Sequence, residues 1–168
     1  AGLPEYKKFD NFNKTNAYWL DDYALFMALK WHFNQKSWQD WDEDIKFRTQ
    51  KGMQKYKELL ADEIGFWKFV QYEFDKQWKK LKEYANENNV DIIGDIPIYM
   101  GLDSSDVWAD AGEFLLDENL TPVKVAGVPP DAFSELGQKW GNPLYDWNKM
   151  EANGFRWWRA RMAHSAEL

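Results

Sequence analysis

The feature that most constrains the fold is a short apolar run that directly follows a long helical pattern. The run is VDIIGDIPIYM, from Val90 to Met100, and it is rich in β-branched residues on both sides of its pleat. A continuous apolar run after a helix is typical of a parallel strand that is buried on both faces. A helix that leads into such a strand is one step of an α/β architecture. In barrels of that class, functional residues lie at and just beyond the carboxyl end of the strand.

Helical spacing dominates the residues before this run. Residues 1–15 are expected to be irregular, and a helix is expected over NAYWLDDYALFMALKW, which begins at Asn16. Residues 34–52 are polar and predict a loop with a short helix. From Gln54 to Asn86, apolar residues repeat at intervals of three and four, with Lys and Glu on the other face. This pattern predicts a long amphipathic helix, which the asparagines of NENN end because Asn favours turns and helix termini.

The residues after the run combine turn signals with short periodic segments. Apolar residues flank DENLTP within residues 113–125, which predicts a hairpin. The following stretch, Ala126–Tyr145, is rich in glycine and proline at its start and is expected to be a long loop. Residues 151–168 have helical spacing again. Asp103 and Asp106 are best explained as N-caps of a helix that carries Val107 and Trp108.

Composition excludes several classes of site and partner. The 168 residues contain no cysteine, and the two histidines, His32 and His164, are far apart, so we expect no metal site. The formal net charge of −7 disfavours a nucleic-acid partner. No apolar run approaches the length of a membrane span and no signal peptide is evident, so we expect a cytoplasmic protein without a membrane partner.

Aromatic residues make up 18% of the chain and include 11 tryptophans, which is the unusual number in its composition. Some of these rings must form the core, and an aromatic-rich core is one interpretation of all of them. The other interpretation is a carbohydrate site, because the C–H face of a pyranose packs on an aromatic ring while its hydroxyls bind polar groups. Spacing alone leaves both interpretations open.

The candidate site residues lie on the apolar run and on the long loop. Asp95 lies within the predicted strand, where its carboxylate either caps backbone amides or points into a site. On the loop, Asp131 and Gln138 could bind sugar hydroxyls, and Phe133 and Trp140 could stack on sugar rings. No pair of carboxylates stands out as a glycosidase acid and nucleophile, and the sequence has neither a phosphate-binding glycine motif nor a serine elbow.

Five ordered stretches resemble one enzyme family. They are NAYWLDDYALFMALK, IIGDIPIYM, DSSDVWAD, VAGVPPDAFSELGQKWGNPLYDW and GFRWWRARM. Together these stretches resemble the 4-α-glucanotransferases called amylomaltase or disproportionating enzyme, from about Asn16 to the end of the chain. The resemblance implies an α/β fold, a (β/α)8 TIM barrel of α-amylase type with helical insertions. It also implies retaining transfer of α-1,4-glucan segments between maltooligosaccharides, with an aspartate nucleophile, a glutamate acid/base and no cofactor.

The resemblance also assigns roles to the candidate residues. Asp95 matches the aspartate at the end of the strand before the nucleophile strand. Asp131, Gln138 and Trp140 match sugar-contacting positions of a mobile loop, and Phe133 matches an aromatic of the acceptor region. Ala132 departs from the family pattern, which often has tyrosine there, and one sugar-stacking ring is therefore lost. Met100 and Gly101 also differ from the usual small apolar pair.

The family motifs that carry the three catalytic carboxylates are absent from this sequence. We therefore expect a mostly helical fragment of the barrel that has no catalytic residue, is inactive alone, and is marginally stable or self-associating. Its expected parts are residues 1–88 (a helical insertion region), 89–100 (a barrel strand), 101–147 (a substrate-binding loop region) and 148–168 (a helix). Two alternatives are a non-catalytic glucan-binding module and a helical interaction domain whose aromatics are all core.

Overall fold

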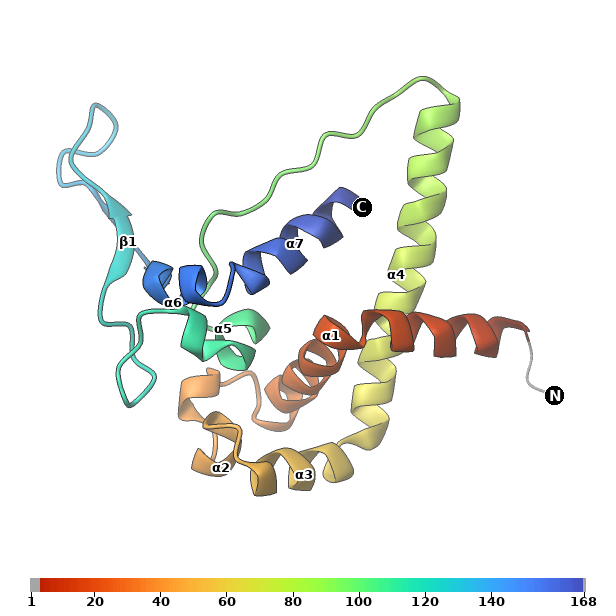
Figure 1. Cartoon of the computed structure of the whole chain (residues 1–168), viewed down its shortest axis with the longest axis horizontal. Helices are drawn as coiled ribbons and strands as arrows, with labels where there is room; N and C mark the ends of the chain where they lie inside the picture. The colour runs from red at the N-terminus through yellow and green to blue at the C-terminus, as the bar shows by residue number, and fades with distance from the viewer. Residues whose placement is uncertain (1–3, 168) are drawn as a thin grey trace. The chain divides into compact units, whose positions relative to one another are not determined.

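The computed structural model describes residues 4–167, and these divide into two compact units at the boundary between Ile93 and Gly94 (Figure 1). The first unit contains α1 (Pro4–His32), a 3-10 turn η1 (Trp38–Asp40), α2 (Glu43–Lys46), α3 (Gln50–Leu59) and α4 (Ala61–Glu87). The second contains α5 (Ser105–Ala109), η2 (Ala111–Glu113), β1 (Val125–Val128), β2 (Gln138–Pro143), α6 (Trp147–Ala152) and α7 (Arg156–Glu167). The described residues are therefore mostly helical, with two strands.

The first unit is built on the packing of α1 against α4, which cross in Figure 1. Aromatic side chains form much of this contact: the ring centroids of Phe9 and Phe69 are 6.0 Å apart, and those of Trp31 and Trp67 are 5.9 Å apart. The Tyr72 hydroxyl on α4 donates to Glu5 Oε2 on α1 over 3.0 Å. Of these residues of α4, only Trp67 belongs to the apolar stripe that the spacing predicts. Phe74 and Leu81 of that stripe are 55% and 52% exposed, while Tyr72, on another face of the helix, is buried.

A second aromatic cluster fills the space between the end of α1, η1 and α3. The Phe33 ring stacks on Trp41 at 5.5 Å and lies 5.7 Å from Tyr56, while Phe26 lies 5.4 Å from Trp41. The Tyr56 hydroxyl donates to Asp42 Oδ2 over 2.6 Å. Because the Tyr56 ring is buried, its hydroxyl needs such a partner, and burial raises the pKa of Tyr56 to about 12.

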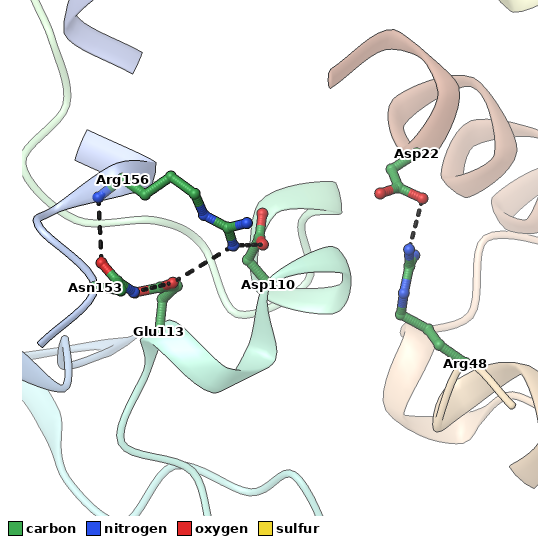
Figure 2. A network of polar contacts seen from close by, with 6 residues as sticks. All are labelled: Asp22, Arg48, Asp110, Glu113, Asn153 and Arg156. Atoms are coloured by element: carbon green, nitrogen blue, oxygen red, sulfur yellow. Dashed lines mark hydrogen bonds and ion pairs between the residues drawn. The ribbon is translucent and has the colours of Figure 1, made fainter. Parts of the chain in front are cut away.

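Polar contacts close the turns of this unit. Arg48, which follows α2 with a φ of 51°, places its Nη2 2.7 Å from Asp22 Oδ1 on α1 (Figure 2). The buried Lys30 ammonium donates to the carbonyls of Gln35 and Lys36 over 2.9 and 2.8 Å. Each contact ties α1 to a segment that the sequence alone shows only as polar loop.

The helical predictions for this unit are partly confirmed. The short helical elements of residues 34–52 and the end of the long helix at Asn88–Asn89 are confirmed, and Asn89 has a φ of 58°. The prediction of irregular structure for residues 1–15 is wrong over 4–15, because α1 begins at Pro4, where proline suits the first helical position. Residues 1–3 lie outside the described part. The helix predicted over 54–86 is two helices that meet at the buried Leu60, since apolar spacing does not reveal a break between helices sharing one face.

The second unit contains an antiparallel ribbon where the sequence predicted a loop over 126–145. Val128 pairs with Gln138, Gly127 with Lys139 and Val125 with Pro143, with an irregularity between Val125 and Gly127. At Gly127, an added Cβ would lie 2.3 Å from the Gln138 carbonyl oxygen, so the strands approach closely only because this residue lacks a side chain. The loop prediction is therefore wrong at both ends of the segment, because glycine and proline here shape a strand pair rather than prevent one.

The hairpin predicted over 113–125 is present in minimal form. Leu116 and Pro122 form an isolated antiparallel bridge, and the Val123 amide donates to the Leu115 carbonyl over 2.9 Å. The Asp117 carboxylate accepts from the amides of Asn119 and Thr121, both over 2.9 Å. An aspartate that binds nearby amides in this way is a common means of stabilising a turn.

Helices close the base of the second unit. The N-cap of α5 is Ser104, whose Oγ accepts from the Val107 amide over 3.3 Å, so the assignment of this role to Asp103 and Asp106 is wrong. The helix predicted over 151–168 is two helices, α6 and α7, separated at Asn153–Phe155. Asn153 Nδ2 donates to both carboxylate oxygens of the buried Glu113, over 2.8 and 3.1 Å, and so fixes this break (Figure 2).

The apolar run Val90–Met100 forms neither helix nor strand, and Figure 1 shows it as an extended trace between α4 and α5. A strand is defined by hydrogen bonds to a neighbour, and no described residue pairs with this run as a strand. Ile93 and Ile98 are instead 95% and 71% exposed. The sequence predicts the extended backbone, but a strand requires a partner.

Candidate glucan-binding ribbon

The tip of the ribbon is held in shape by Asp131. Its Oδ1 accepts from the amides of Phe133 and Ser134 over 2.9 and 2.8 Å, and its own amide donates to the Ser134 carbonyl over 3.0 Å. The Ser134 hydroxyl donates to the Gly137 carbonyl over 2.8 Å. One oxygen of the candidate carboxylate therefore has a structural role in the turn, and Oδ2 remains to bind a ligand.

The same turn displays apolar side chains to solvent. Phe133 is 96% exposed and Leu136, which the sequence analysis did not single out, is 95% exposed. Neither side chain is buried within this unit, so neither adds appreciably to its stability. The hydrogen bond from its amide to Asp131 holds the backbone of Phe133 at the tip, and its ring faces solvent.

Gln138 and Trp140 lie two residues apart on β2 and interact directly. The Trp140 indole Nε1 donates to Gln138 Oε1 over 2.9 Å, and the Trp140 ring remains 51% exposed. Alternation along a strand places positions i and i+2 on one face, which explains why these two side chains meet. The hydrogen bond occupies the Gln138 oxygen and leaves its amide group as a donor.

Asp95 is exposed on the extended segment before α5. The structure joins the end of this segment to the ribbon, because the Tyr99 ring lies 6.4 Å from Trp140 and stacks on Tyr145 at 6.1 Å. The five candidate residues thus occupy one unit. Gln138 contacts Trp140. Asp131 and Phe133 lie together at the tip of the ribbon. Asp95 is connected to the ribbon through the segment that ends at Tyr99.

An aromatic cluster supports the base of the ribbon, and sequence reasoning did not identify it. Tyr145 is buried, and its ring lies 5.3 Å from Phe114 and 5.7 Å from Trp157. The Arg161 guanidinium lies 5.3 Å from the Trp157 ring. Burial raises the pKa of Tyr145 and of Asp106, and in both cases the Arg161 charge opposes the shift. Tyr145 and the rings around it therefore form a packed support for the ribbon. The high density of aromatic residues over 145–158 is the sequence feature that could have indicated this cluster.

Two further kinds of feature, a metal site and a membrane-spanning helix, are absent from the described residues. Among residues 4–167, no group of His, Asp and Glu side chains is arranged to hold a metal ion. The helices in this part of the chain are also too short or too polar to cross a bilayer.

Comparisons with known proteins give a consistent picture. The sequence model of a family described as 4-alpha-glucanotransferase matches residues 3–168. A 4-alpha-glucanotransferase of Clostridium butyricum is 54% identical over 96% of this chain, and one of Thermus thermophilus is 45% identical over 100% of it. The solved amylomaltase from Streptococcus agalactiae in complex with acarbose has a TM-score of 0.90 and 39% identity over 96% of this chain.

The chain spans about a third of each of these proteins: 34% of the two curated relatives and 33% of the solved structure. The resemblance noted in the sequence is confirmed by a family match that covers nearly every residue and by a shared fold. The chain belongs to the 4-alpha-glucanotransferase family.

Proposed function

We propose that this chain is the glucan-binding part of a longer 4-alpha-glucanotransferase, which moves α-1,4-glucan segments between maltodextrins with retention of configuration. Family membership supports the reaction. The single observation that carries the assignment to this chain is the ordered ribbon with exposed rings, Phe133 at 96% and Trp140 at 51%. Glucans are the ligands that match such rings, because their sugar faces are apolar and their edges are polar.

The polar groups of the ribbon then have defined tasks. The Gln138 amide group donates to a sugar hydroxyl, because its oxygen already accepts from Trp140 Nε1. Asp131 accepts from a hydroxyl through Oδ2 while Oδ1 maintains the turn. Trp140 and Phe133 stack on sugar rings, and Asp95 contacts the donor side of the glucan.

The fold of the longer protein explains the exposed extended segment. We propose that residues 89–100 become a strand of a (β/α)8 barrel whose other strands come from the rest of the polypeptide. The exposed Ile93 and Ile98 support this proposal, since apolar side chains on an unpaired extended segment favour burial by neighbouring strands. Residues 1–88 are then a helical insertion, 101–147 the substrate-binding region and 148–168 a helix, and the catalytic carboxylates lie outside this chain.

The test uses the full-length protein with maltotriose as the only substrate. Transfer produces glucose together with longer maltodextrins. We expect Trp140→Ala to raise the KM for maltotriose about tenfold, the scale of one lost aromatic contact with a sugar. Tyr84→Ala is the matched control, because Tyr84 is also an exposed ring (65%) but lies on α4.

Three results would contradict the proposal in different ways. A KM for maltotriose unchanged by Trp140→Ala would show that the ribbon does not bind the glucan through Trp140. Acarbose or maltodextrin binding without any transfer would identify a non-catalytic glucan-binding protein. Transfer by residues 1–168 alone would mean that the catalytic carboxylates lie within this chain.

A further inference from the structure

Two side chains at the base of the ribbon bind the backbone of the extended segment. Asn142 Nδ2 donates to the Met100 carbonyl over 2.9 Å, and the Tyr145 hydroxyl donates to the Ile98 carbonyl over 2.6 Å. These hydrogen bonds join residues that are 42 and 47 positions apart in the sequence. These bonds therefore fix the end of the segment against the base of the ribbon.

Tyr99 lies between these two anchored residues and links them to the candidate sugar-binding ring. Its ring stacks on Tyr145 with planes 13° apart, and its other contact is an edge-to-face approach to Trp140, with planes 65° apart. Tyr145 itself is buried. Trp140 is therefore oriented from two sides, by Tyr99 and by its hydrogen bond to Gln138.

We infer that Asn142 and Tyr145 are positioning residues that set the separation between Trp140 and Asp95 and so allow both to contact one glucan chain. This inference rests on the proposed function. Asp95 lies three residues before Ile98, so at most about 10 Å of extended chain separates it from the first anchored carbonyl. A shift of the segment against the ribbon moves Asp95 relative to Trp140, and the two no longer match the spacing of the glucan.

The test compares variants of the full-length protein by maltotriose kinetics and by acarbose affinity. We expect Asn142→Ala to raise the KM and weaken acarbose binding by about 3- to 10-fold, the factor associated with one hydrogen bond, with kcat changed less than about twofold. Tyr145→Phe keeps the buried ring and removes only the hydroxyl. We expect it to fold and to show the same split between KM and kcat.

Asn153→Ala is the matched control for a purely structural effect. Asn153 makes two side-chain hydrogen bonds to the buried Glu113, so its removal lowers the melting temperature. Its side chain bonds to Glu113 and to the Arg156 amide rather than to residues 98–100 or Trp140, so we expect unchanged KM and acarbose affinity. If all three variants altered KM in proportion to their loss of melting temperature, the positioning role would be overturned.

A double variant separates positioning from general damage. Because Asn142 acts through the separation from Trp140, Asn142→Ala should change KM less than about twofold in a Trp140→Ala background. Equal effects in both backgrounds would overturn the inference. If the wild-type protein did not transfer glucan, the proposed function would fail, and acarbose affinities unchanged by Asn142→Ala would separately overturn the positioning role.

Discussion

Aromatic side chains serve opposite purposes in the two units of this protein. In the helical unit, the Trp38 and Trp41 rings are buried, and Phe33 stacks on Trp41 within a closed cluster. In the second unit, the buried Tyr145 supports a ribbon that displays Trp140 and Phe133 to solvent. The same residue types therefore stabilise the fold in one region and form a candidate binding surface in the other. Neither ring content nor exposure alone distinguishes these roles, because Trp31 and Tyr84 of the helical unit are also 61% and 65% exposed. The ribbon differs in that its exposed rings lie beside the polar groups of Asp131 and Gln138.

The largest effect should come from the buried ring of the helical unit. Trp38 is fully buried, so Trp38→Ala is expected to lower the free energy of unfolding by about 3–5 kcal/mol through lost burial and a cavity. Urea unfolding followed by circular dichroism measures this. Tyr84→Ala is the control, because that ring is 65% exposed. A loss below about 1 kcal/mol for Trp38→Ala would contradict the contrast between the units.

A glycine in the ribbon should give the next largest effect. Gly137 has a φ of 71°, and an added Cβ would lie 2.5 Å from the Val128 carbonyl oxygen. Gly137→Ala should cost about 1–2 kcal/mol for the left-handed backbone alone and should also weaken acarbose binding by distorting the tip. Gly65→Ala is the matched control in α4, where the new Cβ would meet nothing within 4 Å. It should raise stability by about 0.5–1 kcal/mol, because alanine favours helix.

Tyr56 should make the stability of the helical unit depend on pH in the alkaline range. Burial first, and then the hydrogen bond to Asp42, raises the pKa of Tyr56 from 10.0 to about 12. Between these pH values the unfolded chain has lost the phenol proton and the folded chain has kept it, so stability falls as pH rises. Below pH 10, Tyr56 is protonated in both states, and its full contribution to the free energy of unfolding is present.

The measurement for Tyr56 is the difference in unfolding free energy between wild type and Tyr56→Phe. We expect about 1 kcal/mol at pH 7 from the Asp42 hydrogen bond, and a decline from pH 10 to 12. A difference that stayed constant over this range would show that the folded and unfolded states bind the Tyr56 proton equally.

The smallest effect on stability should come from the most exposed ring. Phe133→Ala should change the free energy of unfolding by less than about 0.5 kcal/mol, because almost nothing is buried there. In the full-length protein it should still weaken acarbose binding, by about two- to tenfold. Thermal unfolding and titration of acarbose measure the two quantities, and a loss of stability without a loss of affinity would assign Phe133 to the fold.

The sequence determined the parts of this protein that depend on local chemistry. Helical spacing predicted most of α1 and of the α3 and α4 stretch, asparagines predicted the end of α4, and ordered motifs identified the family. It also indicated the candidate residues Asp95, Asp131, Phe133, Gln138 and Trp140. Each of these inferences uses neighbouring residues or a run of them, which is the information that a sequence carries directly.

Only the tertiary structure decided how distant segments meet. The pairing of β1 with β2, the break at Leu60 and the Glu113–Asn153 contact join residues whose partners no local pattern specifies. The same holds for the bonds from Asn142 and Tyr145 to the carbonyls of residues 98–100. Strand pairing and burial depend on which surfaces the folded chain brings together. For this reason the glycine-rich stretch predicted as a loop forms a ribbon, while the strand-like run Val90–Met100 stays unpaired.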